Sequence, residues 1–106
     1  MEYIGDIIYD DKLVNKDNKF VIFGAGVYGR KVLSYLELNG LRDSIVCFCD
    51  SNETLAGQNI GGIPICMVND VCEKYADAVY LVSGVYAKEM LEILMEKHIF
   101  KIHFFL

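Results

Sequence analysis

The stretch Phe20–Lys31 reads FVIFGAGVYGRK and joins an apolar run to three glycines. Its first four residues form a short, continuous apolar run, which is typical of a strand buried on both faces of a parallel sheet. Gly24, Gly26 and Gly29 follow in a G-x-G-x-x-G array, and a helical apolar pattern begins after the second of them. A strand that passes through such glycines into a helix is typical of a dinucleotide-binding turn. Glycines also occur in such turns for packing alone, so the array leaves both interpretations open.

Each glycine has its own expected role. Gly24 would allow the tight turn, Gly26 would let a diphosphate approach the backbone, and Gly29 would let the helix pack close to the strand. The free N–H groups of the first helical turn and the positive end of the helix dipole would then face the anion. We predict that the following loop residues bind the phosphates: Gly24, Ala25, Gly26, Val27, Tyr28 and Gly29.

Two further pairs of residues complete the predicted site. Asp50 lies 21 positions after Gly29, at the end of a second apolar run, and Ser51 follows it. An acidic residue at this distance accepts hydrogen bonds from ribose hydroxyls and disfavours a 2′-phosphate, so NAD or a nucleoside diphosphate is expected rather than NADP. Ser83 and Gly84 end a third apolar run and are predicted to form the opposite wall, because ligands bind outside the carboxyl ends of the strands where the strand order reverses.

Strand and helix patterns alternate along the chain, which predicts a parallel sheet with right-handed crossovers. The fold class is α/β: a small doubly wound, Rossmann-like parallel sheet of about five strands with helices on both faces. The first strand should be central, with the second on one side of it and the strand at 78–83 on the other. We expect one domain over residues 1–106, in which 1–18 lead into the fold. The predicted strands are 20–23, 44–50, 63–65, 78–83 and 99–106, and the predicted helices are 27–39, 67–76 and 85–98.

The apolar spacing of each helix also predicts which side chains reach the core. Asn69 or Asp70 is expected to cap the helix at 67–76. The expected core positions of the other two helices are Val32, Leu33, Leu36 and Leu38 in the first, and Val85, Met90, Leu91, Leu94 and Met95 in the second.

Composition narrows the class of protein. The formal net charge is −5 and the pI is about 4.8, so binding to a nucleic acid backbone is not expected. The sequence has no apolar run of about 18 residues and no signal-peptide pattern at its start, which predicts a cytoplasmic protein without a membrane span. The apolar content of 54% favours a homo-oligomer or a partner protein that covers the remaining edges and faces.

Neither a metal site nor a catalytic site is predicted. The four cysteines, Cys47, Cys49, Cys66 and Cys72, lack the spacing of zinc ligands and are expected to be small buried hydrophobes, with the first two on one strand face. No tyrosine is followed four residues later by a lysine, and the motifs of metalloproteases, serine hydrolases and P-loop enzymes are missing. We therefore predict no catalytic residues.

Three stretches together resemble a known family: FVIFGAGVYGRKVLSYL at 20–36, VCFCDSN at 46–52 and GQNIGGIPI at 57–65. They are similar to the small Rossmann-like domain at the N-terminus of many bacterial polysaccharide-biosynthesis proteins. These include sugar O- and N-acyltransferases, nucleotide-sugar dehydratases and glycan methyltransferases. The resemblance covers about residues 19–84. It implies a nucleotide or UDP-sugar site at the glycine loop, Asp50 and Ser83–Gly84, with catalysis carried by another domain.

Three functions remain open at this point. The first is a module of glycan biosynthesis that binds a nucleotide or a nucleotide-sugar and is not catalytic alone. The second is an NAD-dependent oxidoreductase subunit whose active site is completed by an oligomer mate or another subunit. The third is an interaction module in which the crevice is empty. The ligand expected in the first two is NAD or a UDP-type nucleotide-sugar.

Overall fold

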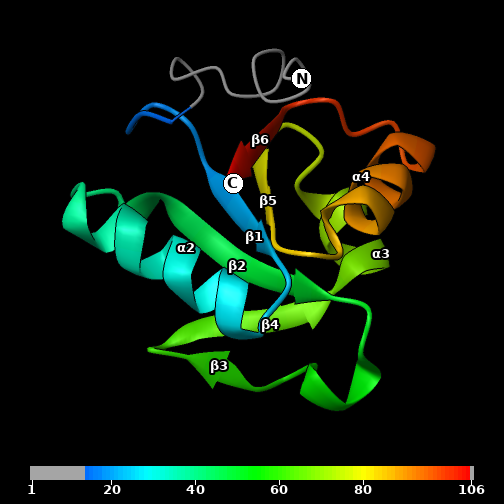
Figure 1. Ribbon diagram of the computed structural model, residues 1–106, viewed down its shortest axis with the longest axis horizontal. Helices are drawn as coiled ribbons and strands as arrows, with labels where there is room; N and C mark the ends of the chain where they lie inside the picture. The colour runs from blue at the N-terminus through cyan, green and yellow to red at the C-terminus, as the bar shows by residue number, and fades with distance from the viewer. Residues whose placement is uncertain (1–13, 106) are drawn as a thin grey trace.

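The computed structural model describes residues 14–105, in which a six-stranded sheet carries helices on both faces (Figure 1). The sheet order is β3-β4-β2-β1-β5-β6. Residues 1–13 of the predicted lead-in segment, and Leu106 of the predicted last strand, lie outside the described residues. The strands are β1 (Phe20–Phe23), β2 (Ile45–Asp50), β3 (Asn59–Ile60), β4 (Ile63–Met67), β5 (Val79–Ser83) and β6 (Ile102–Phe105). The helices are α2 (Val27–Leu38), α3 (Val68–Lys74) and α4 (Ala87–Glu96), with short 3-10 turns at Arg42–Ser44 and Glu53–Leu55.

Strand β1 lies at the centre of the sheet, as the sequence predicts. It pairs in parallel with β2 on one side and with β5 on the other, so that Val21 stands between Cys47 and Tyr80. All four of its residues are buried. The chain leaves β1 toward β2 and β4, and returns across it to β5 and β6, which makes the sheet doubly wound. The reversal of direction places the carboxyl ends of β1, β2 and β5 around a common crevice.

The sheet has one strand more than the predicted five. The loop at 51–62 contains the two-residue strand β3, which pairs antiparallel with β4 through Ile60 and Ile63. Two residues are too few for an apolar period to show in the sequence, so only the pairing reveals this strand. Strand β3 covers the outer edge of β4 and leaves the rest of the sheet parallel.

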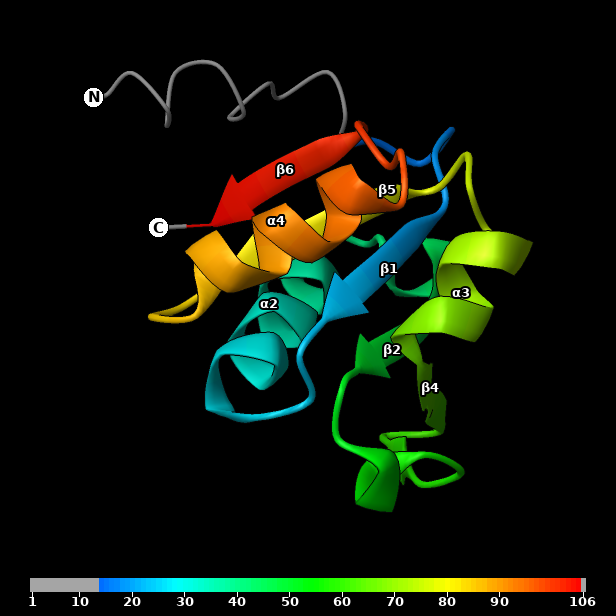
Figure 2. The same ribbon diagram turned by 90° about the vertical axis from the view of Figure 1, so that its right-hand side faces the viewer.

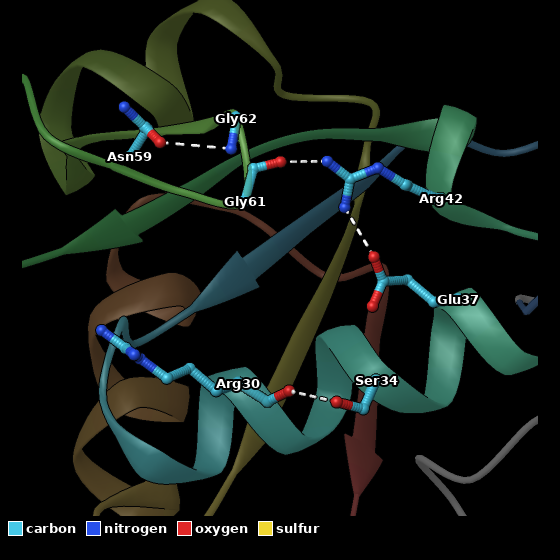
Figure 3. A network of polar contacts seen from close by, with 7 residues as sticks. All are labelled: Arg30, Ser34, Glu37, Arg42, Asn59, Gly61 and Gly62. Carbon is cyan, nitrogen blue, oxygen red and sulfur yellow. Dashed lines mark hydrogen bonds and ion pairs between the residues drawn. The ribbon is translucent and has the colours of Figure 1, made fainter.

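An arginine anchors this added hairpin to the body of the domain (Figure 3). The Arg42 guanidinium donates to Glu37 Oε2 of α2 at 2.7 Å, and also to the carbonyl oxygen of Gly61 in the β3–β4 turn. The turn itself is closed by Asn59, whose Oδ1 accepts from the Gly62 N–H at 3.1 Å. The Arg42–Glu37 pair is partly exposed, so it positions the hairpin more than it stabilises the fold.

The two faces of the sheet are covered by different helices (Figure 2). Helix α2 packs on one face, where Leu36 is fully buried against a cluster that includes Ile22 and Leu81. Helices α3 and α4 pack on the other face, where Leu94 of α4 is fully buried against residues such as Val82. Successive residues of a strand point to opposite faces, which is why β1, β2 and β5 contribute to both clusters.

Several helix details differ from the prediction. Leu38 is 87% exposed. It follows Leu36 by two residues, so its side chain points about 200° around the helix from that buried residue. Val85 is 72% exposed because α4 begins only at Ala87, and Met95 is 50% exposed. Helix α3 has Met67 as its N-cap and no side-chain cap, so the prediction that Asn69 or Asp70 caps it is wrong.

Candidate functional site

Two of the three glycines in the turn between β1 and α2, Gly24 and Gly29, cannot be replaced without strain or overlap. Gly24 has a φ of +96°, and its N–H donates to the Cys49 carbonyl oxygen at 2.7 Å, which extends the β1–β2 pairing into the turn. A Cβ at Gly29 would lie 1.9 Å from the Gly24 carbonyl oxygen. Helix α2 therefore passes directly against the turn, so that Gly29 is required by backbone packing and Gly24 by its positive φ.

Gly26 differs from the other two, because packing places no demand on it. It is the N-cap of α2, its φ is −89°, and a Cβ there would meet no atom within 4 Å. It has no side chain with which to cap the helix, and the first turn carries no acidic residue. The N–H groups at the start of an α-helix have no partner within the helix, and the space beside Gly26 is open on the side where a Cβ would stand. This combination suits the approach of an anion.

Asp50 lies against the same turn at the end of β2. Its Oδ2 accepts a hydrogen bond from the Ala25 N–H at 2.9 Å, and its Oδ1 accepts one from the Asn52 N–H at 2.9 Å. Each carboxylate oxygen has a second lone pair that can accept from a ligand hydroxyl. The carboxylate is thus held in place by the backbone and remains half-buried beside the glycine turn.

A cavity of about 500 Å³, which we call the glycine-loop cavity, lies between this turn and α4. Its size is within the range of small-molecule sites. Its described lining contains two carboxylates, Asp50 and Glu89, and no lysine or arginine. The residues that line it are Phe23, Gly24, Gly26, Val27, Tyr28, Gly29, Asp50, Ser51, Ser83, Tyr86, Glu89, Met90 and Ile93.

The structure brings eight of the ten predicted site residues to this cavity: Gly24, Gly26, Val27, Tyr28, Gly29, Asp50, Ser51 and Ser83. The other two do not line it. Ala25 turns its side chain into the core and offers only its N–H, to Asp50, while Gly84 lines a neighbouring cavity. Sequence reasoning missed the wall supplied by α4 through Glu89, Met90 and Ile93. The apolar period of α4 assigns such residues to the core or to solvent, and no sequence signal shows that they face a glycine loop some sixty residues earlier.

The neighbouring cavity, about 490 Å³ in volume, lies on the α2 side of the sheet, and we call it the α2-face cavity. Tyr28 and Ser83 line both cavities. The remaining lining comes from α2, from the turn before α4, from the first residue of α4 and from the end of β6: Lys31, Val32, Tyr35, Gly84, Val85, Ala87, Phe104 and Phe105. Two adjoining cavities therefore lie where the sequence predicts a crevice, and Tyr28 stands in the wall between them.

The four cysteines are free thiols, three of which are buried. Within residues 14–105 no group of three or more His, Cys, Asp or Glu side chains is arranged to hold a metal ion. Cys47 and Cys49 are buried on the same face of β2 and pack in the core with Cys72, as small hydrophobes do. Burial raises the pKa of Cys47 to about 12, with Cys66 nearby adding to the effect, and burial also raises the pKa of Cys49.

These raised pKa values predict that stability falls in alkaline solution. An unfolded thiol ionises near pH 8.5, whereas the buried thiols stay protonated in the folded protein. The contribution of these thiols to the free energy of unfolding should therefore be constant up to about pH 8 and fall from there until the pH passes the folded-state pKa, about 12 for Cys47, with each buried thiol adding a slope of up to about 1.4 kcal/mol per pH unit. Urea unfolding in reducing buffer at several pH values would measure it. Cys47→Ala should have a shallower slope, and an equally steep slope in this variant would contradict the assignment.

The sequence matches a known family over nearly all of the described chain. The match to the CoA binding domain covers residues 15–105. This chain belongs to the CoA binding domain family. No curated protein sequence matches it significantly. The family is not one of the polysaccharide-biosynthesis families that the sequence resembles, although the Rossmann-like fold implied by that resemblance is present.

A solved structure shares the fold of this CoA binding domain. It is the crystal structure of RSP, a Rex-family repressor, with 21% sequence identity and a TM-score of 0.66. The similarity covers 91% of this chain and 49% of the repressor, so the chain spans about half the length of that protein. At this identity the likeness supports the Rossmann-like fold and carries no information about the ligand. In residues 14–105 no helix combines the length and the apolar character needed to cross a lipid bilayer.

Proposed function

We propose that this domain binds a nucleotide through its diphosphate, in the glycine-loop cavity. The observation that carries the proposal is the N-terminus of α2. Its N-cap, Gly26, lines the cavity, has no capping side chain and leaves open the space that a Cβ would occupy. Backbone N–H groups and the helix dipole stabilise a diphosphate without a basic side chain. Membership of a family defined by a nucleotide-containing cofactor agrees with a ligand of this chemical class.

The cavity favours a nucleotide whose ribose hydroxyls are free. Asp50 is held beside the turn by two backbone N–H groups, and its remaining lone pairs can accept from the ribose. A phosphate on that ribose would face the carboxylate, with Glu89 as a second carboxylate and no cation in the described lining. Coenzyme A and NADP carry such a phosphate, whereas NAD, ADP and UDP-sugars do not. We therefore infer that the ligand of this domain is NAD or another nucleoside diphosphate compound.

Binding measurements with matched nucleotides test this proposal. In thermal-shift and calorimetric titrations, ADP and UDP should stabilise the protein, and a ligand at 100 times its Kd adds about 2.7 kcal/mol. NADP should bind at least tenfold more weakly than NAD, and coenzyme A at least tenfold more weakly than ADP. In Asp50→Asn, the ratios Kd(NADP)/Kd(NAD) and Kd(coenzyme A)/Kd(ADP) should both fall to about threefold or less, because the variant removes the charge that faces the extra phosphate.

Glu89→Gln is the matched control, because it removes a carboxylate from the α4 wall of the same cavity. It should weaken the discrimination less than Asp50→Asn does. Coenzyme A binding more tightly than ADP to the unchanged protein would refute the role assigned to Asp50. If no nucleotide stabilises the folded protein, the domain is an interaction module with an empty crevice.

The same titrations separate the finer functions. A response to UDP-sugars that exceeds the response to UDP supports a module of glycan biosynthesis, which the resemblance of three sequence stretches suggests. A response to NAD that exceeds the response to ADP supports an oxidoreductase subunit. We also propose that a partner or a second copy of the chain covers part of the surface, because apolar side chains such as Leu38, Val85 and Phe100 are each more than 60% exposed.

A further inference from the structure

Tyr28 stands between the two cavities at the carboxyl edge of the sheet. It belongs to the first turn of α2 and lines both the glycine-loop cavity and the α2-face cavity. Its ring lies against Gly84, at the point where the chain leaves β5. A ligand whose diphosphate sits at the N-terminus of α2 would meet this ring before it could enter the α2-face cavity.

The contact between Tyr28 and Gly84 depends on the absence of a side chain. A Cβ at Gly84 would lie 2.5 Å from Cδ2 and 2.7 Å from Cγ of Tyr28. Gly84 also has a φ of +86°, a conformation that side-chain-bearing residues rarely adopt. The ring therefore closes directly over the backbone, and no gap separates it from the end of β5.

The α2-face cavity contains a polar group that the protein leaves without a partner. Ser83 is 6% exposed, and within residues 14–105 its hydroxyl has no hydrogen-bond partner. Strand alternation places its side chain on the α2 side of the sheet, because Leu81 belongs to the cluster on that side and Val82 to the other. Buried hydroxyls are nearly always hydrogen-bonded, so this one indicates a polar ligand atom in the cavity. Lys31 is the cation that lines the same cavity.

We propose that Tyr28 is a specificity-determining residue, which limits the length of the nucleotide that this domain binds. With the ring on Gly84, the glycine-loop cavity takes a compact nucleoside diphosphate. A dinucleotide binds with its second half in the α2-face cavity only when the ring leaves Gly84, and the Ser83 hydroxyl then bonds to a polar group of that half. This inference rests on the proposed function, because it assumes that the diphosphate lies at the N-terminus of α2.

Calorimetric titration of the full 106-residue chain with ADP and with NAD tests the proposal. ADP occupies one cavity only, whereas NAD extends past Tyr28. In Tyr28→Ala the ratio Kd(ADP)/Kd(NAD) should rise at least tenfold over that of the unchanged protein. Tyr28→Phe keeps the ring and should leave the ratio within twofold. In the Tyr28→Ala background, Ser83→Ala should weaken NAD binding at least threefold more than it weakens ADP binding, because Ser83 lines both cavities but its hydroxyl bonds to the second half of the dinucleotide.

Tyr86→Ala is the matched control, because Tyr86 is an exposed tyrosine that lines the glycine-loop cavity from the other side. It should change both dissociation constants by the same factor. Tyr28 is 45% exposed, so its truncation is compatible with folding, which a thermal unfolding scan checks. If ADP binds and the ratio does not change in Tyr28→Ala, the role of Tyr28 is wrong and the proposed function stands. If neither nucleotide binds to any variant, both proposals fail together.

Discussion

Gly29→Ala is expected to destabilise the domain by at least about 3 kcal/mol, a large part of the 5–15 kcal/mol that is typical of such domains. The added Cβ would lie 1.9 Å from the Gly24 carbonyl oxygen and 3.5 Å from the Phe48 ring. The first of these atoms belongs to the backbone, so no side-chain rotation relieves the overlap. Helix α2 would have to move away from β1, which opens the core in which Leu36 is fully buried.

Urea unfolding followed by far-ultraviolet circular dichroism measures this loss. Gly26→Ala is the matched control in the same loop, because its Cβ would meet nothing within 4 Å and its φ is −89°. It should change the free energy of unfolding by less than about 1 kcal/mol. A Gly29→Ala protein as stable as Gly26→Ala would show that α2 does not pack on the turn as described.

Gly26→Val is expected to have the opposite profile, with retained folding and lost ligand binding. The valine side chain would project into the space before the first-turn N–H groups of α2, where we place the diphosphate. The Kd for ADP should rise at least 100-fold, as calorimetric titration measures. The cost to stability should be about 1 kcal/mol, because valine is a poor N-cap compared with glycine.

Arg30→Ala provides the comparison for this binding experiment. Arg30 is exposed one turn into α2 and lines neither cavity, so its removal should change the Kd for ADP less than threefold. Unchanged ADP binding in Gly26→Val, or lost binding in Arg30→Ala, would place the phosphates away from the glycine turn. Together these variants separate the two roles of the glycine array: Gly29 is required for folding, and Gly26 is required for ligand binding.

Most of the fold could be predicted because its strands are continuous apolar runs between clear turn signals. The run at Phe20–Phe23 and the run that ends at Ser83 are buried on both faces, and their order in the sheet follows from the rule for doubly wound topologies. Strand β3 could not be predicted, since it is defined by its pairing with β4. The exposure of Leu38 shows that an apolar residue of a helix reaches the core only from the face that packs on the sheet, because Leu38 lies about 200° around α2 from the buried Leu36.

The glycine side of the candidate site could be predicted in the same way, because its residues lie close together in the sequence. Asp50 could be placed beside the turn from its spacing, but its bond to the Ala25 N–H could not. The contribution of Glu89 and Met90 from α4, the Tyr28–Gly84 contact and the unpartnered Ser83 hydroxyl all join segments that are distant in the chain. Such contacts leave no local pattern.

The amino-acid sequence by itself determined the alternation of strands and helices, the central position of β1 and the tight turn at Gly24. The alternation, the strand order and the turn depend mainly on local sterics and hydrophobic periodicity, and both of these are set by residues that are neighbours in the sequence. Only the tertiary structure decided that the crevice is divided into two cavities and that an aromatic ring forms the wall between them. That arrangement depends on how closely α2, β5 and α4 approach one another. These distances are set by the packing of the whole domain.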